Sequence, residues 1–78
     1  MKSPTERSRS IDGIRPLTRR QTQCLAYIVN GYTAHAIAQE LGISIRMVRA
    51  HLESARLRLG AHSTTQAVYL AAKKQWID

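Results

Sequence analysis

Apolar residues recur at helical spacing in four segments of this 78-residue chain, and no segment shows the alternation of period two that marks a half-buried strand. The four patterns predict helices over about residues 18–30, 33–41, 44–59 and 63–74. Each is short and bounded by turn or cap residues. The sequence therefore predicts an all-α fold of four helices, in which residues 17–78 form one domain.

The second and third predicted helices are separated only by Gly42-Ile43-Ser44. Gly42 can adopt the left-handed conformation that ends one helix, and Ser44 can cap the next. Ile43 is expected to point into the angle between the two helices. So short a connection at a sharp crossing is typical of a helix-turn-helix.

The third predicted helix has one apolar stripe and one polar face. The apolar positions, spaced as one face of a helix, are Val48, Leu52, Ala55 and Leu59. If they face the core, the residues on or beside the opposite face are Arg46, Arg49, Ala50, Glu53 and Arg56. Outward arginines near the start of such a helix are typical of entry into a DNA major groove, where Arg bonds O6 and N7 of guanine. Ordinary surface charge is the competing interpretation, but the turn, the spacing and the charge together favour DNA.

The first predicted helix is interpreted as scaffold. Thr18 and Gln21 have the spacing of a capping box, and an apolar stripe continues through Cys24 and Leu25 to Val29. Thr33 is expected to cap the second helix. Cys24, the single cysteine, excludes an internal disulfide and is interpreted as a small core residue.

The last predicted helix has more apolar positions than one buried face needs. Ser63 and Gln66 again have capping-box spacing at its start. Its expected core positions are Ala67, Leu70 and Ala71. A second, narrow stripe remains, formed by Thr65, Val68 and Ala72. That stripe is a candidate dimer interface, and scattered surface apolar residues are the alternative interpretation.

Charge narrows the class of partner. The net charge is +7, from 12 basic and 5 acidic side chains, and the pI is near 10.6, which suits an anionic partner such as nucleic acid. A membrane-surface peptide can also be basic, but no predicted helix combines an all-basic polar face with a large apolar one. No apolar run approaches the roughly 18 residues of a membrane span, and the N-terminus has no signal-peptide core. We therefore expect no membrane partner and a cytoplasmic, nucleoid-associated location.

Residues 1–16 are polar, with Ser, Thr, Pro, Arg and Gly and only two isoleucines. This composition predicts a flexible basic arm or an interdomain linker. A solvated tail is the simpler interpretation, and contact with phosphates or a minor groove is the alternative.

No constellation predicts catalysis. His35, His51 and His62 are not spaced as a metal set, and no nucleophile lies beside a base. We therefore expect no enzyme activity, no catalytic residues, no metal, no cofactor and no small-molecule ligand within this chain. His51 is expected to donate to a phosphate or to pack at the helix edge.

The whole pattern resembles the DNA-binding domain of the LuxR/FixJ/GerE family of bacterial transcriptional regulators. The resemblance covers Leu17 to about Ile77 and rests on several motifs. They are Leu17-Thr18-x-Arg20, Gly31-x-Thr33-x3-Ile37-Ala38-x2-Leu41-Gly42-Ile43-Ser44, Val48-x2-His51-Leu52, Leu59-Gly60 and Ser63-x2-Gln66-Ala67-Val68.

This resemblance implies a LuxR-type helix-turn-helix domain that regulates transcription. It implies a homodimer joined through the fourth helix, with the third helix in the major groove of a two-fold symmetric operator. The base-contacting positions are then Arg49, Ala50 and Glu53. The backbone-contacting positions that we expect are Thr33, Arg46, His51, Arg56 and Arg58. Double-stranded DNA and a second copy of the chain are the implied partners, with RNA polymerase as a further candidate.

Glu53 departs from the family pattern, which usually has a basic or polar residue at this position. A carboxylate facing DNA repels phosphates, unless it accepts from cytosine N4 or is held by Arg49 one turn earlier. We expect it to pair with Arg49.

Whole regulators of this family carry a signal-receiving domain that binds acyl-homoserine lactones or accepts a phosphoryl group. The chain is therefore expected to be either a DNA-binding half, with residues 1–16 as linker, or a stand-alone member like the small spore regulators. Two other functions stay open. One is a protein-interaction module, an anti-activator that forms heterodimers through the fourth helix, and the other is a sigma-factor region-four domain. The second apolar stripe of residues 63–74 argues against the latter.

Overall fold

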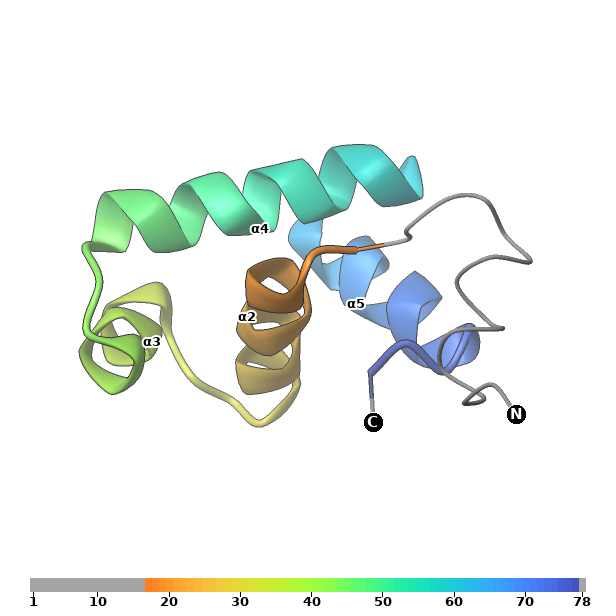
Figure 1. Cartoon of the computed structure of the whole chain (residues 1–78). Coiled ribbons are helices and arrows are strands. Elements are labelled where there is room, and N and C mark those ends of the chain that lie inside the picture. The colour runs from red at the N-terminus through yellow and green to blue at the C-terminus, as the bar shows by residue number, and fades with distance from the viewer. Residues whose placement is uncertain (1–16, 78) are drawn as a thin grey trace, which may run out of the picture.

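Among the helices that the structure describes, α4 (Ile45–Leu59) is the longest, and it packs against the other three. The computed structural model describes residues 17–77, and in that range the chain forms α2, α3, α4 and α5 without a strand. In Figure 1, α4 runs along the top, with α3 below one end, α5 below the other and α2 between them. The predicted all-α fold of four helices is confirmed. The arm or linker predicted for residues 1–16 lies outside the described residues.

The helix α2 (Arg19–Val29) begins at the predicted capping box. The Thr18 hydroxyl accepts from the Gln21 backbone N–H at 3.1 Å, and the Gln21 side-chain oxygen accepts from the Thr18 N–H at 3.0 Å. These two bonds satisfy donors that a helix start otherwise leaves unpaired. One turn later, Cys24 and Leu25 are fully buried, which confirms Cys24 as a core residue.

The helix α3 (Ala34–Leu41) is only eight residues long. Its predicted N-cap is confirmed, because the Thr33 hydroxyl accepts from the Ala36 N–H at 3.1 Å. Isolated helices of this length are not stable in water, so α3 depends on tertiary packing. That packing comes from Ile37 and Ala38, which are both buried in the core.

The helix α5 (Thr64–Lys73) begins at Ser63, whose hydroxyl accepts from the Gln66 N–H at 3.0 Å, as predicted. The reciprocal bond of the capping box is different, because the Gln66 side chain accepts from the N–H of His62 and not of Ser63. The φ of Ser63 is −153°, more extended than the −77° of Thr18 in the complete box of α2.

The chain reverses after α5 and closes the core. The Trp76 N–H donates to the Ala71 carbonyl at 2.8 Å, and Gln75 takes a left-handed conformation with φ 63°. Ile77 is buried as a result, and the Trp76 side chain packs against the core.

All four helices contribute to one hydrophobic core. The predicted stripe of α4 is confirmed, with Val48, Leu52 and Ala55 buried and Leu59 packed against them. The predicted stripe of the first helix was wrong at its end, because Val29 is 42% exposed. Val29 is the last residue of α2, and no element covers it there. The buried hydrophobic residues are Leu17, Cys24, Leu25, Ile37, Ala38, Val48, Leu52, Ala55, Ala61, Ala67, Ala71 and Ile77.

We expect Leu25→Ala to lower the free energy of unfolding by about 2–5 kcal/mol, because it leaves a cavity where the side chain is fully buried. The matched control is Leu57→Ala, which removes the same atoms from a side chain that is 63% exposed and should change stability by less than about 0.5 kcal/mol. Urea denaturation followed by circular dichroism measures both. Equal losses in the two variants would contradict this core.

Candidate nucleic-acid interface

The outward face of α4 lies opposite its buried stripe and carries four of the predicted site residues. Arg46, Arg49, Ala50 and Glu53 are all exposed. Arg46 is three or four positions before Arg49 and Ala50, and these are four and three positions before Glu53, so the four residues lie along one side of the helix. Within the part of the chain that the structure describes, the Arg46 and Arg49 side chains form no ion pair or hydrogen bond with one another or with other groups. Their guanidinium groups are available to a ligand.

The turn between α3 and α4 sets the direction in which this face points. Gly42 ends α3 in the left-handed conformation, with φ 69° and its N–H bonded to the Ala38 carbonyl. Ser44 starts α4, and its hydroxyl accepts from the Met47 N–H at 3.0 Å. The Ile43 side chain is partly buried against the core, as predicted. Both predicted caps of the helix-turn-helix are thus confirmed.

The N-termini of α3 and α4 are both suited to anions. Each starts at an exposed hydroxyl residue, Thr33 or Ser44, and neither has an acidic residue in its first turn. A hydroxyl that accepts one hydrogen bond as a cap still has its own O–H to donate. Backbone N–H groups and the helix dipole add to the attraction for a phosphate at such a position.

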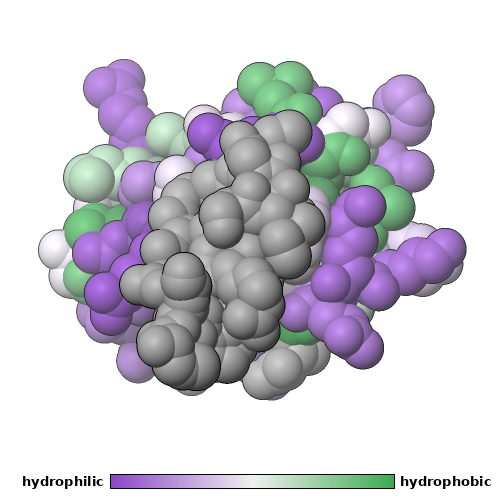
Figure 2. All heavy atoms as spheres, turned by 45° about the vertical axis from the view of Figure 1, so that its right-hand side comes forward, coloured by the Kyte–Doolittle hydropathy of each residue, from purple (hydrophilic) through white to green (hydrophobic). Residues whose placement is uncertain are grey.

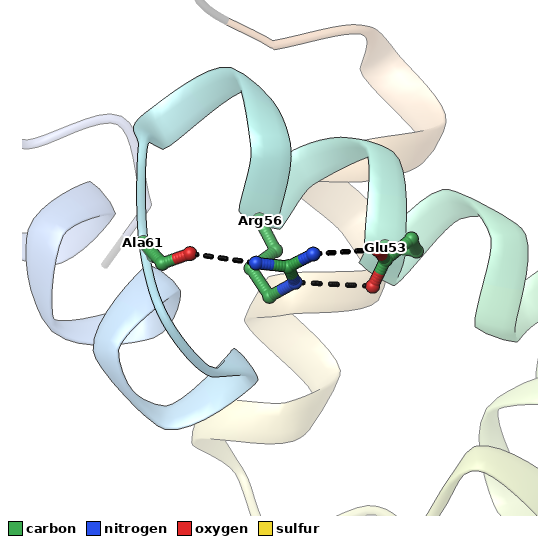
Figure 3. A network of polar contacts seen from close by, with 3 residues as sticks. All are labelled: Glu53, Arg56 and Ala61. Carbon is green, nitrogen blue, oxygen red and sulfur yellow. Dashed lines mark hydrogen bonds and ion pairs between the residues drawn. The ribbon is translucent and has the colours of Figure 1, made fainter.

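The Glu53 carboxylate is bound by Arg56 (Figure 3). Arg56 Nε donates to Glu53 Oε1 at 3.0 Å, and a terminal guanidinium nitrogen, Nη2, donates to Oε2 at 2.6 Å. The other terminal nitrogen, Nη1, donates to the Ala61 carbonyl at 2.8 Å. The predicted pairing of Glu53 with Arg49 was therefore wrong. Arg56 lies closer to the C-terminal end of α4, where its guanidinium also reaches a carbonyl of the following turn.

This network shifts the pKa values of both partners toward their charged forms. The hydrogen bonds from Arg56 lower the pKa of the Glu53 carboxyl, and those same bonds raise the pKa of the Arg56 guanidinium. At neutral pH the pair is therefore a carboxylate and a guanidinium with no net charge. Glu53 thus adds little negative potential to the basic face of α4.

The remaining predicted backbone-contacting positions of α4 differ in exposure. The Arg56 side chain is only 26% exposed, and its bonds to Glu53 and Ala61 occupy the guanidinium, so it lies at the flank of the outward face and not on it. His51 is partly buried, whereas Arg58 is exposed.

Two large apolar side chains on the outward side of α4 were missed by the sequence analysis. Met47 and Leu57 are 47% and 63% exposed. Figure 2 shows hydrophobic residues in green at the top of the molecule, the side along which α4 runs. The signal was present in the sequence, because both residues fall outside the buried stripe at 100° per residue.

Only part of the predicted dimer stripe on α5 is exposed to solvent. Thr65 and Ala72 are exposed, but Val68 is partly buried and packs against the core. The sequence analysis missed Tyr69, which is 60% exposed and lies on the same outward side, with the Lys73 ammonium 5.9 Å from its ring centroid. An aromatic ring thus adds to the small-residue stripe.

The described residues hold no group of three His, Cys, Asp or Glu side chains that could bind a metal ion. Burial raises the pKa of the Cys24 thiol, the direction opposite to that of a reactive cysteine. None of the described helices has the length and apolar character needed to cross a bilayer.

Comparisons with known proteins agree with this geometry. The family model described as "Bacterial regulatory proteins, luxR family" matches residues 15–71. A solved structure titled "Structure of Transcription factor, GerE" is similar to this fold with a TM-score of 0.79 and 25% sequence identity, over 83% of this chain and 97% of that chain.

Two curated relatives are longer than this chain. The transcriptional regulatory protein YdfI of Bacillus subtilis (strain 168) is 41% identical over 58 residues, which is 74% of this chain and 27% of that protein. The oxygen regulatory protein NreC of Staphylococcus aureus (strain JH9) is 29% identical over 76 residues, which is 97% of this chain and 35% of that protein. The chain thus spans about a quarter to a third of these relatives.

We expect Gly42→Ala to destabilise the protein by about 1–2 kcal/mol, because a side chain is strained in the left-handed conformation. A Cβ at this position meets nothing within 4 Å, so backbone strain is the whole cost. Gly42→Asn should lose less stability than Gly42→Ala, since Asn tolerates the left-handed conformation better than Ala. Urea denaturation compares the two, and an Ala variant as stable as the Asn variant would contradict the assigned turn.

Proposed function

Because the chain belongs to the luxR family of bacterial regulatory proteins, and its helices form the DNA-binding domain of such a transcriptional regulator, we propose that it binds a two-fold symmetric operator as a homodimer. In this proposal α4 of each copy enters the major groove. The two helices then lie about one DNA turn, or 34 Å, apart or at a multiple of that distance. The operator accordingly contains two inverted half-sites.

The outward face of α4 is the observation that carries the proposal. Arg46 and Arg49 project near the N-terminal end of a helix held by a helix-turn-helix, where side chains reach base edges in known complexes. Their guanidinium groups are not used by described residues of the domain itself. Arg49 can therefore bind guanine O6 and N7 without breaking an internal contact.

We assign the contacts to DNA in two groups. Base edges are contacted by Arg49, Ala50 and Glu53, with the Ala50 methyl suited to a thymine methyl. Phosphates are contacted by Thr33, Arg46, His51 and Arg58, which position the domain without reading sequence. We exclude Arg56 from the second group, because Glu53 and Ala61 already bind its guanidinium.

The dimer contact that we propose is the outward side of α5. Thr65 and Ala72 are small and exposed, so two copies of the helix can approach closely there. Tyr69, with 60% of its surface exposed, supplies the apolar area that the small residues lack. Val68 contributes the part of its side chain that the core leaves exposed.

We expect Arg49→Ala to weaken binding to the preferred operator by about 1–3 kcal/mol and to relax preference at one base pair per half-site. Arg58→Ala is the matched contrast. It should weaken binding to all sequences alike and make the salt dependence shallower, because a phosphate contact releases counterions but reads no base. Selection from a random DNA pool, followed by titrations at several salt concentrations, measures both effects. Unchanged sequence preference in Arg49→Ala would contradict the placement of α4.

We expect Ala72→Glu to abolish the dimer, because the two-fold axis brings the new carboxylates together. Gln39→Glu, an equal charge change at an exposed position of α3, is the control and should leave the dimer intact. Sedimentation of each protein with duplexes that contain one or two half-sites measures its oligomeric state on DNA. A dimer retained by Ala72→Glu would contradict this interface. A wild-type dimer that binds no promoter DNA would support the anti-activator instead.

A further inference from the structure

The Glu53–Arg56–Ala61 network runs from a buried turn, which we call its fixed end, to a solvent-exposed carboxylate, which we call its open end. Its fixed end is the turn after α4, where Gly60 ends the helix in the left-handed conformation and Ala61 is buried in the core. The Ala61 carbonyl accepts from Arg56 at 2.8 Å, and the Arg56 side chain is partly buried. Its open end is the Glu53 side chain, which is 56% exposed on the outward face of α4.

Two hydrogen bonds fix the plane of the Glu53 carboxylate. Each carboxylate oxygen receives one N–H from the planar guanidinium, at 3.0 and 2.6 Å (Figure 3). Such a bidentate pair restricts the rotation of the carboxylate more than a single contact does. Each oxygen still has acceptor capacity, because an ionised carboxylate offers about four lone-pair sites. Glu53 is thus a pre-oriented carboxylate that can accept a further hydrogen bond beside those from Arg56.

The ligand that matches this group is the amino group of a base. Two bases present an amino donor in the major groove, cytosine through N4 and adenine through N6, whereas guanine O6 and N7 and thymine O4 are acceptors. Adenine N7 lies beside its amino group and, as an acceptor, repels a carboxylate, so cytosine is the better match. An unpaired carboxylate would also be repelled by the phosphates on both sides of the groove. The neighbouring guanidinium cancels that charge at short range, so the acceptor can approach the base edge.

We propose that Arg56 is a positioning residue that holds Glu53 to read cytosine through its 4-amino group. This inference rests on the proposed placement of α4 in the major groove. It assigns to Glu53 the selection of one base pair per half-site. It assigns to Arg56 an indirect role, since the guanidinium faces the protein turn and the carboxylate and not a phosphate.

The test begins with selection of bound sequences from a random duplex pool, using the full chain and four variants. Glu53→Ala should lose a cytosine preference of about ten-fold at one position of each half-site. Glu40→Ala is the matched control, because it removes an equal charge from an exposed carboxylate of α3 and should keep that preference. Each variant removes one negative charge, so a cytosine preference that is lost only in Glu53→Ala reports the position of that carboxylate and not its charge.

The other two variants test the role of Arg56. Arg56→Lys keeps the positive charge but cannot bind both carboxylate oxygens and the Ala61 carbonyl, so we expect most of the cytosine preference to be lost. Arg56→Ala should lose it as well. Neither should change the salt dependence of binding, because no phosphate contact is removed. Circular dichroism melting of each variant monitors folding.

A chemical probe needs no variant of the protein. Cytosine carrying a methyl group on N4 still pairs with guanine, but the methyl replaces the amino hydrogen in the major groove. In the selected operator, this change at the assigned position should weaken wild-type binding by about ten-fold and should not weaken binding by Glu53→Ala.

The outcomes separate this inference from the proposed function. If the wild-type protein shows no sequence preference, the proposed function fails and this inference fails with it. If the wild-type protein is selective but N4-methylation or Glu53→Ala leaves the preference unchanged, only this inference is overturned. If Arg56→Lys keeps the preference, the positioning role of Arg56 is wrong. If Arg56→Ala weakens binding to all sequences equally and makes the salt dependence shallower, Arg56 is a phosphate contact and the positioning role is wrong as well.

Discussion

Burial of the apolar stripe of α4 is the interaction on which the rest of this domain depends. The other three helices have only 8 to 11 residues each, lengths at which isolated helices are marginal in water. Each packs against α4, whose Val48 and Leu52 are buried in the shared core. The same burial orients the functional face. With 3.6 residues per turn, directing Val48 and Leu52 inward directs Arg46, Ala50 and Glu53 outward.

The electrostatics of the domain follow from how few carboxylates it has. Residues 17–77 contain eight basic side chains and two acidic ones, Glu40 and Glu53. Arg56 neutralises Glu53 at short range, so the carboxylate on the outward face does not cancel the potential of Arg46 and Arg49. A positive surface of this kind accelerates association with DNA and makes it dependent on salt. Sequence preference has to come from the few side chains that reach base edges.

Most of the fold could be predicted because its determinants are local. Each helix starts at a hydroxyl residue that binds a backbone N–H three residues later, and these residues are Thr18, Thr33, Ser44 and Ser63. Gly42 lies in the left-handed conformation that the turn needs. The spacing of apolar residues then identified the buried face of α4. The DNA contacts and the dimer contacts remain predictions.

What the sequence determined by itself was the position of each helix, its caps and its buried face, since these depend on residues within four positions of one another. The tertiary structure decided which partner Glu53 takes, because Arg49 and Arg56 are both within helical reach and only Arg56 also reaches the Ala61 carbonyl. It also decided how much of Val68 the core covers and that Tyr69 stays exposed, since that depends on how α5 sits against the other helices. Helical spacing alone cannot distinguish these outcomes, because they depend on contacts between segments that are distant in the chain.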